Sequence, residues 1–404
     1  MDLLNDNKNK KPQKTKGQKI VLTLLIISII LCIVIGALIF TLDKGVLETR
    51  YTMILNGQTI SENDIGLLQL EDGSKYISIK KMCSKLEYDY YNGEYEIATE
   101  SKDKGYIDNK KNIIQFYSNS NEIFKTKDKE NRDYERYTLS HNIIQYNEDL
   151  YVCIDDLAIA LNVIQQYSEK NNQTIMATPE YWLSINKSNL DKLGYTVSEE
   201  PENITAIAYG YVIVKYNNKF GVIDLEKKEI IGCKYNDMTF VEYTGNFIVS
   251  NNNDKYGIIN IQGNTEIELQ YDSISVLNFD PLLYQVEKLK KYGIMREDGS
   301  IINQIQYSSL GYPEDTQNNI DYTLIIPELN ENIPESIVVK IDNSYGLIEL
   351  ETGKEIIPCE LNGIFLVIDQ DLTKYYVVRL KDGTLDTLEN YIKSMNFITV
   401  NVNE

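Results

Sequence analysis

The residues most able to do chemistry are few and scattered. In 404 residues there is one His, His141, and there are five Cys, none of them in a CxxC pair. The cysteines are Cys32, Cys83, Cys153, Cys233 and Cys359. A zinc site usually takes about four clustered nitrogen or sulfur ligands, so this inventory argues against a metal centre. It is also too sparse for disulfides to be the main stabiliser, and we expect free, mostly buried thiols.

Acidic residues give no clear catalytic pattern either. The adjacent carboxylates Asp155-Asp156 and Glu199-Glu200 are able to exchange protons, but such pairs arise by chance among 60 acidic residues. Asp72-Gly73, Asp298-Gly299 and Asp382-Gly383 are typical of turns, since the alternating acidic ligands of a calcium loop are missing. The sequence contains no nucleophile elbow, P-loop, GxGxxG or HExxH motif. We therefore expect a protein that is not an enzyme and holds no cofactor or metal.

Net charge limits the partners. The formal charge is −20, although residues 1–19 carry six Lys and two Asp. The rest of the chain is therefore strongly acidic and repels phosphate backbones, which argues against nucleic acid as a partner. The simplest reading of this acidity is that it keeps the folded domains soluble.

An apolar segment near the N-terminus predicts a membrane anchor. Residues 20–42 are 23 uncharged residues, long enough as a helix to cross a bilayer core of about 30 Å. The lysines lie before it, so the positive-inside rule places residues 1–19 in the cytoplasm and residues 43–404 outside. A cleaved signal peptide would have a shorter apolar region and a small-x-small site. We expect an uncleaved single-pass anchor in the cell membrane, in contact with lipid.

One pattern occurs twice within residues 50–185. Tyr76, Ile79, Leu86 and Tyr88 recur 75 residues later as Tyr151, Ile154, Leu161 and Val163. Each copy starts with strand-like alternation and changes to helical spacing. A second strand follows each helix, over Tyr95–Ile97 and Thr174–Met176. The sequence predicts a small α+β module, used twice.

This duplicated region resembles the copper amine oxidase-like N-terminal domain, a stalk domain of bacterial surface proteins. The resemblance rests on Leu55-Asn56-Gly57, on the two Tyr-x-x-Ile entries into a helix and on the strands after them. It implies a non-catalytic spacer. The region contains a single His, so no copper chemistry is expected.

A second domain, residues 206–404, follows a polar linker at 186–205. An aromatic-Gly pair recurs in it, with the glycines 36, 36 and 53 residues apart. The pairs are Phe220-Gly221, Tyr256-Gly257, Tyr292-Gly293 and Tyr345-Gly346. A Gly kept in phase inside a strand indicates a bulge or close approach of a neighbouring backbone. We expect tandem three-stranded β repeats, stacked in a propeller-like or solenoid arrangement.

The repeats resemble the WG repeat family, with Phe or Tyr where that family usually has Trp. At least four units are present, and a degenerate fifth falls at Tyr375–Gly383. The resemblance implies a β-repeat platform for interactions.

The longest interval between repeats contains an insertion within Gly311–Glu335. This stretch carries five acidic candidates for a partner-binding loop: Glu314, Asp315, Asp321, Glu328 and Glu331. Insertions in repeat proteins often lie on the binding face. The alternative is a tolerated surface insertion without a role, because lengthening a loop costs little.

The fold expected from these patterns is mainly β with a small α+β module, preceded by a transmembrane helix. The expected function is a membrane-anchored extracytoplasmic scaffold that binds an envelope protein or a glycan. One alternative is a transmembrane sensor or regulator of an envelope process, which the short 19-residue tail disfavours. Another is a module that binds cell-wall glycan, since the chain has 31 Tyr, although Tyr is also a common strand residue.

Overall fold

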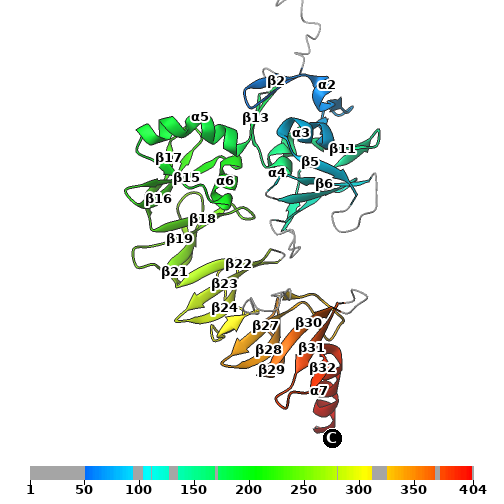
Figure 1. Ribbon diagram of the computed structural model, residues 1–404. Coiled ribbons are helices and arrows are strands. Elements are labelled where there is room, and N and C mark those ends of the chain that lie inside the picture. Colours follow the sequence, from blue (N-terminus) through cyan, green and yellow to red (C-terminus); the bar gives the residue numbers. More distant parts are fainter. Residues whose placement is uncertain are drawn as a thin grey trace, which may run out of the picture. The chain divides into compact units, whose positions relative to one another are not determined.

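The computed structural model describes residues 51–93, 103–110, 112–126, 135–168, 172–279, 281–311, 325–368 and 374–402. In this part the chain is mainly β, as predicted (Figure 1). The expected anchor at 20–42 and the expected strand at 95–97 lie outside the described residues. Among the helices that the structure describes, none combines the length and the apolar character needed to span a bilayer.

The duplicated strand-to-helix unit is present in both predicted places. In the first copy β4 (Lys75–Ser78) leads into α3 (Ile79–Leu86), where the Ser78 hydroxyl accepts a hydrogen bond from the Lys81 amide. In the second copy β11 (Asp149–Cys153) leads through a 3-10 turn (Ile154–Asp156) into α4 (Leu157–Leu161). Both helices end on a residue with left-handed backbone, which closes the last turn.

The two copies meet at the centre of one antiparallel sheet. Strand β4 pairs with β11, so that Tyr76 lies opposite Cys153 and Ser78 opposite Tyr151. The short strands β3 (Leu68–Gln69) and β10 (Ile144–Tyr146) complete the sheet in the order β10-β11-β4-β3. Side chains of Tyr76, Tyr151 and Cys153 form a small shared core. The two copies of the duplicated unit therefore complete one sheet together.

Two further sheets complete this region. The first has the order β12-β13-β1-β2, with α2 (Glu62–Ile65) following β2. Its strands are β1 (Thr52–Leu55), β2 (Gln58–Ile60), β12 (Ile164–Ser168) and β13 (Gln173–Ala177). The second is a meander of β5 (Asp89–Asn92), β6 (Lys104–Asp108), β7 (Ile113–Tyr117), β8 (Glu122–Thr126) and β9 (Glu135–Thr138). The repeated pattern gave no hint of this meander, because it lies between the two copies.

The predicted linker at 186–205 is wrong. Helix α5 (Pro179–Lys192), strand β14 (Thr196–Val197) and helix α6 (Pro201–Ala208) occupy it. Each helix starts at a proline, whose fixed φ suits the first helical turn. Trp182, Leu190 and Ile207 are buried against strands of the first repeat. The polar residues that suggested a linker are mostly exposed in α5, but Asn203 and Thr205 of α6 are buried.

The repeats form successive small antiparallel sheets in the described part of the chain (Figure 1). The first holds β14, β15 (Tyr211–Tyr216), β16 (Lys219–Asp224) and β17 (Glu229–Tyr235); the second holds β18 (Asp237–Val241), β19 (Asn246–Ser250), β20 (Tyr256–Ile259) and β21 (Thr265–Tyr271). The third holds β22 (Ser273–Phe279), β23 (Leu282–Lys288) and β24 (Lys291–Arg296). The fourth holds β25 (Ser309–Leu310), β26 (Ile325–Ile326), β27 (Ser336–Ile341), β28 (Ser344–Glu349) and β29 (Glu355–Leu361). The last holds β30 (Gly363–Ile368), β31 (Lys374–Arg379) and β32 (Leu385–Thr387), before helix α7 (Leu388–Val402).

The expectation of three strands in every unit needs correction. The sheets that begin with β14 and β18 have four strands each. Strand β18 starts just after the repeat tyrosine Tyr235, whereas β14 comes from the region expected to be a linker. In β18 the apolar residues Met238 and Phe240 alternate with Asp237 and Thr239, and the apolar pair is buried. This period of two is the pattern of a half-buried strand.

Neighbouring repeat sheets share hydrophobic cores. One cluster joins the first two sheets through Ile213, Val222, Met238, Phe240 and Phe247, and the next joins the second and third through Ile258, Ile267, Tyr284 and Val286. The third and fourth sheets share Leu283, Ile294, Val339 and Ile348, and the fourth and fifth share Val338, Leu347, Ile364 and Val378. Each unit thus buries against its neighbour the apolar surface that it cannot bury alone.

Candidate functional site

The glycines of the aromatic-Gly pairs have a structural role. A β-carbon built on Gly257 would lie 2.5 Å from the carbonyl oxygen of Ile267 and 2.8 Å from the amide nitrogen of Leu269. The pairing of β20 with β21 shifts register at this point. Gly221 and Gly346 face the next strand in the same way, and Gly293 faces Ile305. The predicted bulge and close backbone approach are confirmed.

The aromatic residues of these pairs occupy one register. Phe220, Tyr256 and Tyr345 lie opposite Tyr235, Tyr271 and Leu361 on the following strand, and Tyr292 bridges to Tyr307. The regular spacing in the sequence therefore reflects cross-strand contacts. In addition, the Tyr256 hydroxyl donates a hydrogen bond of 3.1 Å to Asp237. The anchors hold the sheets together, and Tyr256 also reaches a cavity described below.

The acidic insertion is partly a sheet element. Glu314, Asp315 and Asp321 lie outside the described residues. Glu328 and Glu331 are exposed. Before them, β26 (Ile325–Ile326) pairs with β27, and after them comes Ile333. Ile326 and Ile333 are both 1% exposed in the core. This end of the predicted loop belongs to the fourth sheet, because its isoleucines are needed to fill the core.

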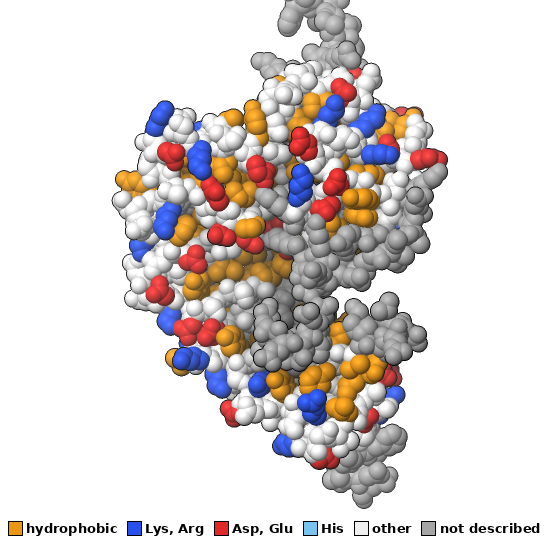
Figure 2. Space-filling model, viewed as in Figure 1, with side chains coloured by type: hydrophobic (Ala, Val, Ile, Leu, Met, Phe, Trp, Pro, Cys, Tyr) orange, Lys and Arg blue, Asp and Glu red, His pale blue; other side chains and the backbone are white. Residues whose placement is uncertain are grey.

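A cavity of about 530 Å³ lies beside the first strands of the second and third sheets. Alternate residues of β18 and β22 present polar groups to it, among them Asp237, Thr239, Ser273 and Ser275. Apolar side chains form most of the remaining wall: Phe240, Val241, Ile248, Ile274, Val276 and Phe279. Figure 2 shows hydrophobic side chains gathered beside acidic ones in this part of the repeats. We call this cavity the repeat cleft.

The repeat cleft is acidic. Among the described residues that line it, four are acidic, namely Glu135, Glu202, Asp237 and Glu242, and none is basic. The Lys125 ammonium, from β8, lies 2.9 Å from a Glu242 carboxylate oxygen, and both side chains are 4% exposed. The Tyr209 hydroxyl donates to the same oxygen at 2.9 Å. Burial, followed by the Glu242 charge, raises the pKa of Tyr209, so this hydroxyl stays protonated.

The lining of the repeat cleft suits one kind of ligand. Apolar walls with a few fixed carboxylates suit a ligand that carries both positive charge and apolar surface. The thiols are poor nucleophiles, because burial raises the pKa of Cys83 to about 12 and that of Cys153 to about 11. The four cysteines in the described part of the chain are unpaired, as expected. Two are buried, and Cys233 and Cys359 are half-buried beside Gly221 and Gly346.

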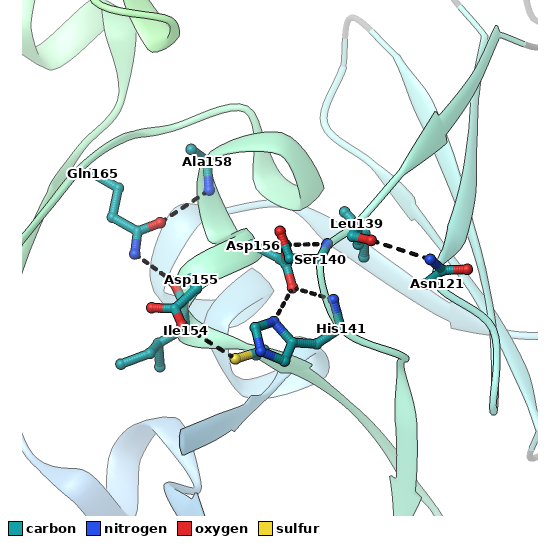
Figure 3. A network of polar contacts seen from close by, with 10 residues as sticks. Asn121, Leu139, Ser140, His141, Ile154, Asp155, Asp156, Ala158 and Gln165 are labelled. Atoms are coloured by element: carbon teal, nitrogen blue, oxygen red, sulfur yellow. Dashed lines mark hydrogen bonds and ion pairs between the residues drawn. The ribbon is translucent and has the colours of Figure 1, made fainter. Parts of the chain in front are cut away.

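A second polar cluster lies in the duplicated region, and the sequence patterns did not predict it. The Asp156 carboxylate is 1% exposed and accepts hydrogen bonds from the Ser140 amide at 2.7 Å and the His141 amide at 3.0 Å. The His141 Nδ1 lies 3.0 Å from the same carboxylate (Figure 3). Asp155 and Cys153 lie close by. From the sequence, the adjacent carboxylates Asp155 and Asp156 were interpreted as a chance pair. In the structure Asp155 is exposed, whereas Asp156 is buried and hydrogen-bonded.

Comparison with known proteins bears on the repeats. Residues 220–255 and 256–292 match the family described as "WG containing repeat". These residues are WG-type repeats. The match covers two of the aromatic-Gly units, and the resemblance of residues 50–185 to a stalk domain stays a prediction.

The other comparisons assign no further family to the chain. No curated protein matches the sequence significantly. Among solved structures, BBS1N in complex with ARL6DN aligns with 70% of this chain and 72% of its own, at 11% identity and a TM-score of 0.21. Hsv2p of Kluyveromyces lactis aligns with 74% of this chain and 96% of its own, at 8% identity and a TM-score of 0.23. At such TM-scores the alignments do not establish a shared fold.

Proposed function

We propose that this chain is a membrane-anchored, non-catalytic scaffold whose WG-type repeats bind another envelope protein outside the cell. The observation that carries the proposal is the repeat cleft, a cavity of about 530 Å³ built on strands β18 and β22. Anchoring by residues 20–42 and an extracytoplasmic position rest on the apolar run and on the lysines before it. A stalk role for residues 50–185 rests on the resemblance of the duplicated module.

Charge complementarity favours a basic segment of a protein as the occupant. Glu135, Glu202, Asp237 and Glu242 line the repeat cleft, and one of them, Glu242, is neutralised by Lys125. Apolar residues such as Phe240 and Phe279 provide room for aliphatic stems or aromatic rings. A Lys or Arg side chain has this character, with an apolar stem and a charged end. A glycan is the rival occupant, with Tyr256 as its stacking surface.

Site-specific photo-crosslinking in intact cells tests the proposal. A benzophenone amino acid replaces Ser275, an exposed residue that lines the cleft, or Glu226, an exposed turn residue of the first repeat, in the full-length chain. We expect a protein adduct at Ser275 and none at Glu226. Protease added to the cells should degrade that adduct, because the repeats are proposed to lie outside.

A charge reversal makes the test specific for the cleft. Glu202→Lys should reduce the Ser275 adduct by about fivefold, because one attractive contact worth about 1 kcal/mol becomes repulsive. The melting temperature of the variant shows whether it is folded. Equal adduct yields at Ser275 and Glu226 would contradict binding in the repeat cleft. So would a Ser275 adduct whose yield is unchanged by Glu202→Lys. An adduct whose added mass is removed by glycosidase would assign the cleft to a glycan.

A further inference from the structure

Three potential metal ligands lie together at the second copy of the duplicated module. His141, Cys153 and Asp155 each offer one ligand atom, and these atoms lie within 4.8 Å of one another. Cys153 ends strand β11, and Asp155 lies in the 3-10 turn that follows, 4.0 Å from the thiol. His141 comes from the loop between β9 and β10. The cluster combines nitrogen, sulfur and oxygen atoms from two chain segments.

Asp156 orients the imidazole for such a role. Its carboxylate is buried and fixed by two backbone amides, and it lies 3.0 Å from Nδ1 of His141. Figure 3 shows these contacts converging on Asp156. Because Nδ1 is engaged with Asp156, Nε2 is left to bind a metal. A carboxylate behind a histidine is the usual outer support of a metal-bound imidazole.

The distances suit a site that closes slightly around an ion. Zinc bonds of about 2.0–2.3 Å in a tetrahedral site place ligand atoms roughly 3.3–3.8 Å apart. The cluster must therefore contract by about 1 Å. Asp155 is exposed, so its side chain can rotate towards an ion without disturbing the core, and the His141 side chain is 37% exposed, so solvent reaches the site. Cys153 and Asp156 are buried and supply the fixed part of the site.

We propose that His141, Cys153 and Asp155 bind one divalent transition metal of the zinc class, with solvent at the remaining position. Calcium and magnesium prefer oxygen ligands alone, whereas a mixed nitrogen, sulfur and oxygen set suits zinc or cobalt. Closed structural zinc sites have four protein ligands. A site with three exchanges its metal more readily and accepts a fourth ligand from a partner. The competing explanation is a polar network that closes a turn and binds no ion.

Cobalt provides the test, because Co²⁺ replaces zinc and reports its ligands by absorption. The full-length chain, purified without a histidine tag, reduced and freed of metal, is titrated with Co²⁺. We expect one ion per chain, ligand-field bands of tetrahedral intensity and a sulfur-to-cobalt charge-transfer band. Zn²⁺ should displace the Co²⁺ and so remove these absorption bands. Absence of the charge-transfer band in the wild-type protein would overturn the proposal.

Matched variants separate this site from other thiols. Cys153→Ser should abolish the charge-transfer band, and Cys83→Ser, at an equally buried thiol, should preserve it. Asp156→Asn should weaken Co²⁺ binding by about 10- to 100-fold while the band persists, since Asp156 positions His141. If Cys153→Ser does not fold, His141→Asn at a partly exposed ring should still lose binding. Binding that survives both changes would leave the turn-closing network as the explanation.

Discussion

The duplicated module and the WG-type repeats both reuse one sequence pattern, but their copies meet differently. In the module, strand β4 of one copy pairs with β11 of the other, so two copies complete one sheet. In the repeats, each sheet packs face to face on the next and shares a hydrophobic core with it. A closed pair needs no third copy, whereas a series leaves a face to cover at each end.

Elements outside the repeat pattern pack at both ends of the series. Helices α5 and α6 bury Trp182 and Ile207 against the first sheet, and α7 adds Leu388 and Ile392 to the core that the last two sheets share. The closed pair has diverged instead. Ser78 caps α3 in the first copy, whereas Cys153 holds the matching place before the 3-10 turn of the second. The two copies of the closed pair therefore differ in how their helices begin, whereas the series differs most from its own pattern at its ends.

The largest expected effect tests whether the two regions are energetically independent. Lys125→Met leaves the Glu242 carboxylate, whose side chain is 4% exposed, without its ammonium partner. Breaking a buried ion pair in this way typically costs about 3–5 kcal/mol. We expect the unfolding midpoint of the whole protein to fall accordingly, measured by denaturant titration.

Two further variants show whether the loss of stability comes from the unpaired buried charge. Lys187→Met removes an exposed pair with Glu199, and it should leave the midpoint unchanged within error. Lys125→Met combined with Glu242→Gln should recover part of the loss, because no buried charge is then left alone. A midpoint unaffected by Lys125→Met would show that the module and the repeats unfold independently.

A smaller effect concerns the insertion in the fourth repeat sheet. Ile326→Ala removes a side chain that is 1% exposed and packs in the core shared by the last two sheets. Truncations of this kind cost about 2–5 kcal/mol, and we expect about 3. Glu328→Ala, two residues away and exposed, should cost under about 0.5 kcal/mol. Equal midpoints for both variants would return this whole stretch to the status of a surface loop.

The repeats and the duplication could be predicted because their patterns are local in the sequence. Features that depend on long-range contacts could not be predicted. The in-phase glycines mark close backbone approach, and the tyrosines 14 residues later lie opposite the aromatic residues that precede those glycines, so the spacing reflects these contacts directly. Thr178-Pro179 and Pro201 were available as helix-start signals, but the polar residues of α5 and α6 were interpreted as a linker. The repeat cleft depends on which strands become neighbours. His141 and Asp156 meet only through the fold, so counting ligand types in the sequence could not find them.

The last prediction asks whether the series truly depends on its glycines. In Gly257→Ala the new β-carbon meets backbone atoms of β21 at 2.5 and 2.8 Å, and backbone cannot give way cheaply. We expect a loss of about 2 kcal/mol in unfolding free energy. Gly232→Ala, in strand β17, meets nothing nearer than the Glu229 side chain at 3.5 Å, so it should be neutral or slightly stabilising. If both variants melt alike, the shift in register between β20 and β21 does not constrain position 257, and the repeats tolerate divergence as freely as the closed pair.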